Sequence, residues 1–310
     1  GSRKSDALSF SRRAQRRFRA IEGQIEVGGV PLIRAHPLSP GGSFAARLAK
    51  RRGLPYVVTL RYSDIEAIWK YEPHLRPMAR RILGGAARVV CLGGAAKEKV
   101  LGWVTGAGRD ALAGKLRVIP NGLDPAWLDG VSRTAAHTPV RVGFAGRMNE
   151  RKRPLDALNA AHEAGYAVAA CGDGPLKEAF CAAMRPQDRY LGRISGMDAM
   201  KAFYADCDVL LVPSAAETFG MVYLEAMSQG VPVLYTKGQG FDGQFPEGEI
   251  GYAVPCGDVQ AQTEALKQVT QGYAQRSQRC VAGAEKYAWP RIAGMWMRLY
   301  REICIEKRGV

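Results

Sequence analysis

Two glutamates, Glu217 and Glu225, follow an apolar run that predicts a buried strand over residues 209–213. Gly220 lies between them and permits a sharp entry into a helix predicted over residues 220–229. The first N–H groups of such a helix are unpaired and carry a positive partial charge, so they can face an anion. These groups belong to Phe219, Gly220, Met221 and Val222. Since carboxylates accept hydrogen bonds from hydroxyl groups, the pattern indicates a ligand with both hydroxyls and phosphates. A surface glutamate plus a glutamate in a helix's first turns is the alternative.

Two basic residues, Arg147 and Lys152, follow another predicted strand, over residues 140–145. This strand leads into Gly146, where the missing side chain lets a phosphate approach the main chain, and a helix is predicted from Pro154 onward. A guanidinium offers two parallel donors and an ammonium offers a point charge, so the pair can hold two phosphates. A solvated basic loop is the alternative, and the matching position of the two glutamates favours the ligand-binding interpretation.

Two further turns are rich in glycine. Gly172 and Gly174 follow a predicted strand over residues 167–171, where tight-turn chemistry alone explains them. The segment over residues 237–243 contains three further glycines after a strand predicted over 231–235. This segment either lines the site or forms a plain surface loop.

Short β-type runs alternate with helical stretches along the chain. Strands are predicted over residues 30–35, 56–60, 88–92, 116–119, 140–145, 167–171, 209–213, 231–235 and 252–254. Helices are predicted over residues 43–52, 64–83, 95–104, 154–164, 197–207, 220–229, 260–271 and 292–306. Such alternation is typical of parallel sheets covered by helices on both faces. The sequence therefore predicts two doubly wound α/β domains, in which ligands bind beyond the carboxyl ends of the strands.

The composition of the 310-residue chain, with 47% hydrophobic and 24% charged residues, excludes collagen-like and disordered proteins. No apolar run reaches the roughly 18 residues of a membrane span. The cysteines lack Cys-x-x-Cys spacing and the histidines lack an i, i+4 pair, so we expect a cytoplasmic protein without a metal site. The net charge of +15 predicts an anionic partner. Nucleic acid is not expected, since neither a zinc-finger spacing nor an RNP-like aromatic stretch is present.

Basic residues gather near the N-terminus. Over residues 10–25, apolar side chains recur at helical spacing and arginines fill much of the remaining circumference, and residues 74–83 repeat this pattern. Basic amphipathic helices lie on anionic membrane surfaces, so we expect peripheral attachment to the inner membrane face. A helix that faces the core with a solvated basic back is the alternative.

In combination, these motifs resemble the glycosyltransferase group 1 family, which comprises retaining enzymes of the GT-B fold, here of the bacterial surface-polysaccharide type. The matching residues are Gly146-Arg147…Lys152, Gly172-Asp-Gly174-Pro175 and Glu217-x-Phe219-Gly220-x4-Glu225. The resemblance extends from about residue 30 to the C-terminus. It implies two Rossmann-like domains facing a cleft, a shortened acceptor-side domain over residues 1–130 and a nucleotide-sugar domain over 131–288. A C-terminal helix over 289–310 would cross back to the first domain.

The resemblance also implies roles for single residues. Arg147 and Lys152 would hold the diphosphate of a UDP- or GDP-linked sugar, Glu217 would contact the sugar, and Glu225 would bind the ribose. The other donor-binding positions would be Gly146, Gly172, Gly174, Ile194, Phe219, Gly220, Met221 and Val222. The basic residues would replace a metal in stabilising the leaving group, so neither a metal nor a further cofactor is expected. The acceptor would be a glycan or lipid-linked molecule in cell-surface polysaccharide synthesis.

The acceptor side departs from the family pattern. Arg61 stands after the strand over residues 56–60, where many relatives carry a histidine, and an arginine stays protonated. His36 is then a weak candidate for the general base, and Asp64 is a further acceptor-side candidate. A nucleotide-sugar epimerase or hydrolase of similar fold and a non-catalytic polyanion-binding protein are the alternative functions.

Overall fold

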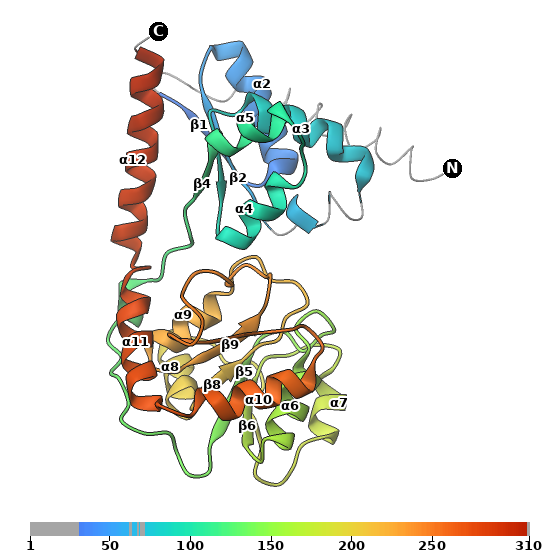
Figure 1. The fold of residues 1–310 in the computed structure, drawn as a ribbon, viewed down its shortest axis with the longest axis vertical. Coiled ribbons are helices and arrows are strands. Elements are labelled where there is room, and N and C mark those ends of the chain that lie inside the picture. The colour runs from blue at the N-terminus through green and yellow to red at the C-terminus, as the bar shows by residue number, and fades with distance from the viewer. Residues whose placement is uncertain (1–30, 62–63, 67, 69–71, 309–310) are drawn as a thin grey trace. The chain divides into compact units, whose positions relative to one another are not determined.

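The computed structural model describes residues 31–61, 64–66, 68 and 72–308, which form two compact units (Figure 1). The first unit comprises the described residues up to Leu92, Ala96–Ile119 and the residues from Met295 onward. The second comprises Gly93–Ala95 and Pro120–Gly294. The arginine-rich helix predicted over residues 10–25 lies outside the described residues.

The first unit contains a four-stranded parallel sheet in the order β1-β2-β3-β4. Its strands are β1 (Ile33–Ala35), β2 (Tyr56–Thr59), β3 (Arg88–Cys91) and β4 (Leu116–Val118). Every residue of β2 and β3 is buried, as expected for strands that are covered on both faces. The register sets Val57 beside Arg88 and Val58 beside Val89.

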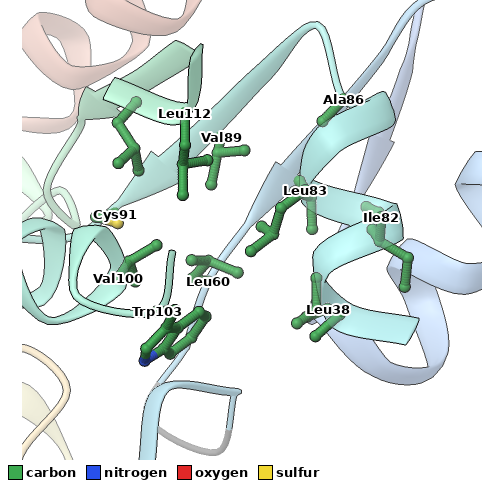
Figure 2. Packing of buried hydrophobic residues seen from close by; sticks show 14 of the residues in the cluster. Leu38, Leu60, Ile82, Leu83, Ala86, Val89, Cys91, Val100, Trp103 and Leu112 are labelled. Carbon is green, nitrogen blue, oxygen red and sulfur yellow. The ribbon is translucent and has the colours of Figure 1, made fainter. Parts of the chain in front are cut away.

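Helices of the first unit cover this sheet. They are α2 (Ser43–Arg52), α3 (Arg76–Gly85), α4 (Gly94–Leu101), α5 (Ala107–Lys115) and the C-terminal part of α12 (Trp289–Arg308). Figure 2 shows Leu83 of α3 and Val89 of β3 among the buried side chains of this core, with Leu60, Val100 and Trp103 nearby. The apolar faces of the helices and the strands thus form one hydrophobic core.

One predicted helix is wrong in extent. The sequence predicts a single helix over residues 64–83, whereas the structure has π-helical residues at 64–66 and 68, a 3-10 turn over Pro73–Leu75 and then α3 from Arg76. Glu72 is not helical (φ −126°, ψ 57°), and Pro73 has no N–H group with which to continue a helix that precedes it. The sequence also leaves α5, α11 (Tyr273–Glu285) and the two-residue strand β7 (Arg189–Tyr190) unpredicted.

The second unit contains a six-stranded parallel sheet in the order β10-β9-β8-β5-β6-β7. Its other strands are β5 (Arg141–Ala145), β6 (Ala167–Cys171), β8 (Val209–Leu211), β9 (Val233–Thr236) and β10 (Gly251–Val254). The chain begins in the middle of the sheet at β5, builds outward to β7, and then returns to β8 on the other side. The strand order therefore reverses between β5 and β8, and ligands bind beyond the carboxyl ends of strands at such a switch point.

Four helices connect strands of the second unit: α6 (Pro154–Glu163), α7 (Lys177–Ala182), α8 (Met197–Ala205) and α9 (Met221–Ser228) (Figure 1). Two more, α10 (Val259–Val269) and α11, follow its last strand. Within the described ranges, we find no helix with the length and apolar composition that crossing a membrane requires. Both predicted sheets of parallel strands are thus present. The strand order reverses in the second unit, whereas the described strands of the first unit follow chain order.

Candidate functional site

The loops that follow β5 and β6 are bonded to each other at the switch point. The N–H of Gly146 donates to the carbonyl of Cys171 (3.1 Å), and the N–H of Met148 donates to that of Asp173 (2.9 Å). Gly172 has a φ of +139°, and a Cβ atom there would lie 1.8 Å from the carbonyl oxygen of Gly146. Only glycine permits this approach, so Gly172 fixes the spacing of the two loops.

A cavity of about 720 Å³ opens between these loops. Its lining consists of Gly146, Arg147, Asn149, Gly172, Asp173, Gly174, Pro175 and Arg193. The volume lies in the range of small-molecule sites. The guanidinium groups of Arg147 and Arg193 lie here beside glycines, whose main chain a ligand can approach closely. This combination suits an anionic ligand such as a phosphate ester.

Lys152 and Glu217, which lie 65 residues apart in the sequence, form an ion pair between Nζ and Oε2. Both side chains are only 15% exposed. The other carboxylate oxygen of Glu217 accepts a hydrogen bond from the N–H of Thr218 (3.1 Å). The main chain supports the pair, since the N–H of Ala215 donates to the carbonyl of Arg151 (2.8 Å). The structure therefore brings together two residues that the sequence predicts in one site.

Gly146 connects this ion pair to the cavity. It lines the cavity, and the position of its absent Cβ lies 3.8 Å from Cδ and Cε of Lys152. Arg147, the next residue, lines the cavity with an exposed side chain. Arg153 follows Lys152 with a φ of 53° and is the one non-glycine residue with a positive φ in the described ranges. Such a conformation costs energy and is often found next to functional sites.

Glu225 lies on α9, and its Oε2 atom accepts a hydrogen bond from the hydroxyl of Tyr204 (2.9 Å). Burial raises the pKa of Glu225 above its usual value, and the Tyr204 hydroxyl opposes this rise. Burial raises the pKa of Cys171 to about 12, and the charge of Glu225 contributes to that rise. Glu225 is therefore electrostatically coupled to the end of β6, next to Gly172 of the cavity lining. The structure does not place Glu225 in contact with Lys152 or Glu217.

The N-terminus of α9 begins at Met221, and Gly220 forms its cap with a φ of 87°. Gly220 has no side chain with which to bond the first N–H groups of α9, which suits a helix end that receives an anion. Met221 and Val222 are half-buried, whereas the Phe219 ring is 1% exposed and packs against Phe241 and Tyr287. Phe219 can therefore contact a ligand only through its main chain.

The remaining predicted donor-side residues lie around the glycine turns. A Cβ atom at Gly174 would lie 2.4 Å from the carbonyl oxygen of Met148. The carbonyl of Gly192 accepts a hydrogen bond from the N–H of Gly172 (2.8 Å), which fixes the segment that leads to the half-buried Ile194. This segment also supplies Arg193 to the cavity lining.

The acceptor-side candidates belong to the first unit. Asp64 is 1% exposed, and its carboxylate accepts hydrogen bonds from the N–H groups of Leu38 (3.1 Å) and Arg61 (2.8 Å). It thereby joins the loops after β1 and β2, which is a structural role. Partial burial and the nearby Arg34 and Arg61 lower the pKa of His36 to about 4. His36 is therefore neutral near pH 7 and is a weak base.

Sequence reasoning missed several residues at the site. Asn149 accepts a hydrogen bond from the N–H of Lys152 (3.0 Å) and so shapes the loop before α6. Its position three residues before Lys152 is a usable signal, because asparagine commonly bonds the main chain of its own turn. Tyr204 lies in a helical apolar pattern, and nothing in that pattern distinguishes it from an ordinary core residue.

Known structures share this architecture. The chain superposes on the Anabaena protein HepE, solved in complex with UDP, with a TM-score of 0.74, 18% identity and coverage of 93% of this chain and 82% of that one. The lipopolysaccharide outer core galactosyltransferase WaaB gives a TM-score of 0.73 at 16% identity, with coverage of 98% and 82%. Two parallel-sheet Rossmann-like units of this kind define the GT-B class of folds.

The sequence comparisons name the family. Residues 131–287 match the model of the glycosyl transferases group 1 family, and the chain belongs to this family. A phosphatidyl-myo-inositol mannosyltransferase of Mycobacterium leprae is 28% identical, over 96% of this chain and 79% of that protein. The lipopolysaccharide core biosynthesis glycosyltransferase LpsE of Rhizobium meliloti is 29% identical, over 65% and 56%. The protein is therefore a glycosyltransferase, as the motifs predict.

Proposed function

We propose that this enzyme is a retaining glycosyltransferase that moves a hexose from a UDP- or GDP-linked donor to a glycan or lipid-linked acceptor in cell-surface polysaccharide synthesis. The contact of Lys152 with Glu217 beside the glycine-lined cavity supports this function best. It sets a cation for the diphosphate next to a carboxylate for the sugar hydroxyls. The printed names of the mannosyltransferase, LpsE and the UDP-bound HepE support the same class of substrates.

The donor would bind at the switch point of the second unit. Arg147, Lys152 and the open N–H groups of α9 would hold the diphosphate, because all of them donate hydrogen bonds to oxyanions. Glu225 would accept hydrogen bonds from the ribose hydroxyls, and Glu217 would accept them from the hydroxyls of the sugar. The segment around Ile194 would lie beside the base.

The proposed reaction is a front-side displacement. The bond between the anomeric carbon and the diphosphate breaks, the acceptor oxygen bonds to the same face of that carbon, and the hydroxyl proton goes to the leaving diphosphate. Lys152, Arg147 and the α9 N–H groups would stabilise the charge that develops on the leaving group. This scheme uses no metal ion, so we expect a chelator to leave turnover unchanged.

The acceptor would be reached at a membrane surface. The net charge of +15 favours an anionic surface, and Lys50, Arg51 and Arg52 form an exposed basic end of α2 in the first unit. We propose peripheral attachment to the inner membrane face through this charge and the arginine-rich N-terminal segment. A lipid-linked acceptor would then lie in the same surface.

A thermal-shift panel tests the donor assignment. UDP, GDP, ADP, CMP and dTDP are added in turn at one concentration, and a ligand that binds the folded state alone raises the melting temperature more when its Kd is lower. We expect selective stabilisation by UDP or GDP. Equal stabilisation by all five, or by none, would contradict the donor site.

The variant Lys152→Ala tests the diphosphate contact. Loss of a charge-assisted contact to a leaving group costs about 2–4 kcal/mol of transition-state stabilisation, a fall of roughly 30-fold to 1000-fold in turnover. Turnover is followed as release of nucleoside diphosphate from UDP-glucose and GDP-mannose, with and without phosphatidylinositol vesicles. Lys267→Ala, at an exposed position on α10, is the matched control. An isomerised sugar in place of transfer would indicate an epimerase.

A further inference from the structure

The glycine-rich loop that follows β9 lies directly against the segment that bears Glu217. The side-chain amide of Gln239 bridges two main-chain groups there: its Oε1 accepts from the N–H of Glu217 (3.1 Å), and its Nε2 donates to the carbonyl of Ala215 (3.2 Å). The N–H of Gly240 donates to the carbonyl of Glu217 (3.1 Å). Three hydrogen bonds thus hold the main chain on both sides of the Glu217 side chain.

Gly240 allows this approach. A Cβ atom at residue 240 would lie 1.9 Å from the carbonyl oxygen of Thr218 and 2.7 Å from the nitrogen of Phe219. Any other residue would push the two segments apart, and the hydrogen bonds of Gln239 would lengthen. The glycine therefore serves close contact between two loops, which a plain surface loop does not require.

A buried aromatic side chain, Phe241, fixes the loop after β9 to the hydrophobic core. Phe241 is 1% exposed, and its ring packs against those of Phe219, Tyr223 and Tyr235, with ring centroids 4.9–6.1 Å apart. The next residue, Asp242, joins the two ends of the loop, since its carboxylate accepts a hydrogen bond from the N–H of Gly238 (2.6 Å). Gln239 is thus presented from a loop that is itself fixed at both ends.

The sheet order explains why the Glu217 segment needs this support. β8 lies between β9 and β5, so the loop after β8 has one neighbouring loop on each side. On the β5 side it meets Arg151 through Ala215 and Lys152 through the Glu217 carboxylate. On the β9 side it meets Gln239 and Gly240.

We propose that Gln239 is a positioning residue for Glu217, which it holds opposite Lys152 by bridging Ala215 and Glu217. This inference rests on the proposed function, in which Glu217 orients the donor sugar and Lys152 binds the diphosphate. Loss of the bridge should misplace the sugar and leave the nucleotide contacts intact. The effect should therefore fall on turnover and not on the affinity for the free nucleotide.

The variant Gln239→Met tests the proposal, because methionine preserves the length and bulk of the side chain and removes both hydrogen bonds. Gln268→Met, at an exposed position on α10, is the matched control. Three quantities are compared with the wild type: amide hydrogen exchange of residues 215–219, the Kd for UDP and for GDP, and nucleotide release from UDP-glucose, UDP-galactose, UDP-N-acetylglucosamine and GDP-mannose.

In Gln239→Met we expect amide exchange at Glu217 to accelerate about tenfold and turnover to fall about 10- to 100-fold, with nucleotide Kd values changed less than about twofold. Unchanged exchange, or faster exchange with unchanged turnover, would overturn the proposal. An equal loss of nucleotide affinity would indicate a general structural defect and would also overturn it. If the wild type releases nucleotide from none of the donors, the proposed function fails, and exchange at Glu217 still decides whether Gln239 holds this segment.

Discussion

Among single residues, Lys152 has two partners in the proposed function: Glu217 and the diphosphate of the donor. An ammonium group has three donors, and the ion pair with Glu217 uses one of them. Two donors remain for phosphate oxygens on a side chain that keeps 15% of its surface exposed. The carboxylate thus orients the ammonium group without consuming its capacity to bind a diphosphate.

Glu225 and Tyr204 give a prediction about pH. Only the ionised carboxylate accepts hydrogen bonds from both ribose hydroxyls. Because burial raises the pKa of Glu225, donor affinity should begin to fall with decreasing pH above the usual carboxyl range. The Tyr204 hydroxyl stabilises the charged form, and Tyr204→Phe should therefore raise this pKa further. A hydrogen bond to a charged group is worth about 1.5–3 kcal/mol, so we expect the acid limb of nucleotide affinity to move up by about one pH unit or more.

The measurement is the Kd of the preferred nucleoside diphosphate between pH 4.5 and 8. Tyr166→Phe serves as the control, since Tyr166 is a half-buried tyrosine of the same unit outside the site. An acid limb at the same pH in Tyr204→Phe and the wild type would show that Glu225 does not carry the ribose contact.

Residue types and spacing are sufficient to predict that Lys152 and Glu217 lie close together, because each follows a strand of a parallel sheet and the carboxyl ends of such strands share one edge. They were insufficient for Tyr204 and Gln239. The roles of these two residues depend on which atom a side chain reaches across the fold, and a single sequence does not encode that contact locally.

At the scale of elements, the switch point depends on the loops after β5 and β6 lying in contact. Gly172→Ala would place a Cβ atom 1.8 Å from the carbonyl of Gly146, so one loop must move. We expect a loss of about 1–3 kcal/mol in the free energy of unfolding, as for other strained main-chain positions, together with loss of nucleotide binding. Urea unfolding and the thermal-shift panel measure the two effects.

Gly165→Ala is a suitable control for this variant. Gly165 also has a positive φ, of +79°, but a Cβ atom there would meet nothing within 4 Å. Any loss in Gly165→Ala reports main-chain strain alone. If Gly172→Ala binds nucleotide as well as the control does, the close contact of the two loops is not required for the site.

The elements themselves were largely predictable. Strands with continuous buried runs, such as β2 and β6, and helices with clear boundaries, such as α2, coincide closely with their predicted ranges. β7 has only two residues and gives no periodic signal. The single helix predicted over residues 64–83 is wrong at Glu72 and Pro73, because the missing N–H of Pro73 is a local constraint that outweighs the spacing of the apolar residues.

At the scale of the whole molecule, the charge of +15 predicts salt-dependent membrane binding. The chain should sediment with phosphatidylglycerol vesicles at about 50 mM salt and should dissociate as salt screens the surface charge toward about 500 mM. Phosphatidylcholine vesicles are the control. Equal binding to both lipids, or none to either, would contradict peripheral attachment through charge.

In the proposed function, four residues far apart in the sequence surround one nucleotide-sugar: Arg147, Lys152, Glu217 and Glu225. A crystal structure of the enzyme with its preferred donor tests this most directly. We predict hydrogen bonds from Arg147 and Lys152 to the diphosphate, from the ribose to Glu225 and from the sugar to Glu217. A diphosphate bound out of reach of Lys152, or a ribose away from α9, would show that these residues do not form the donor site.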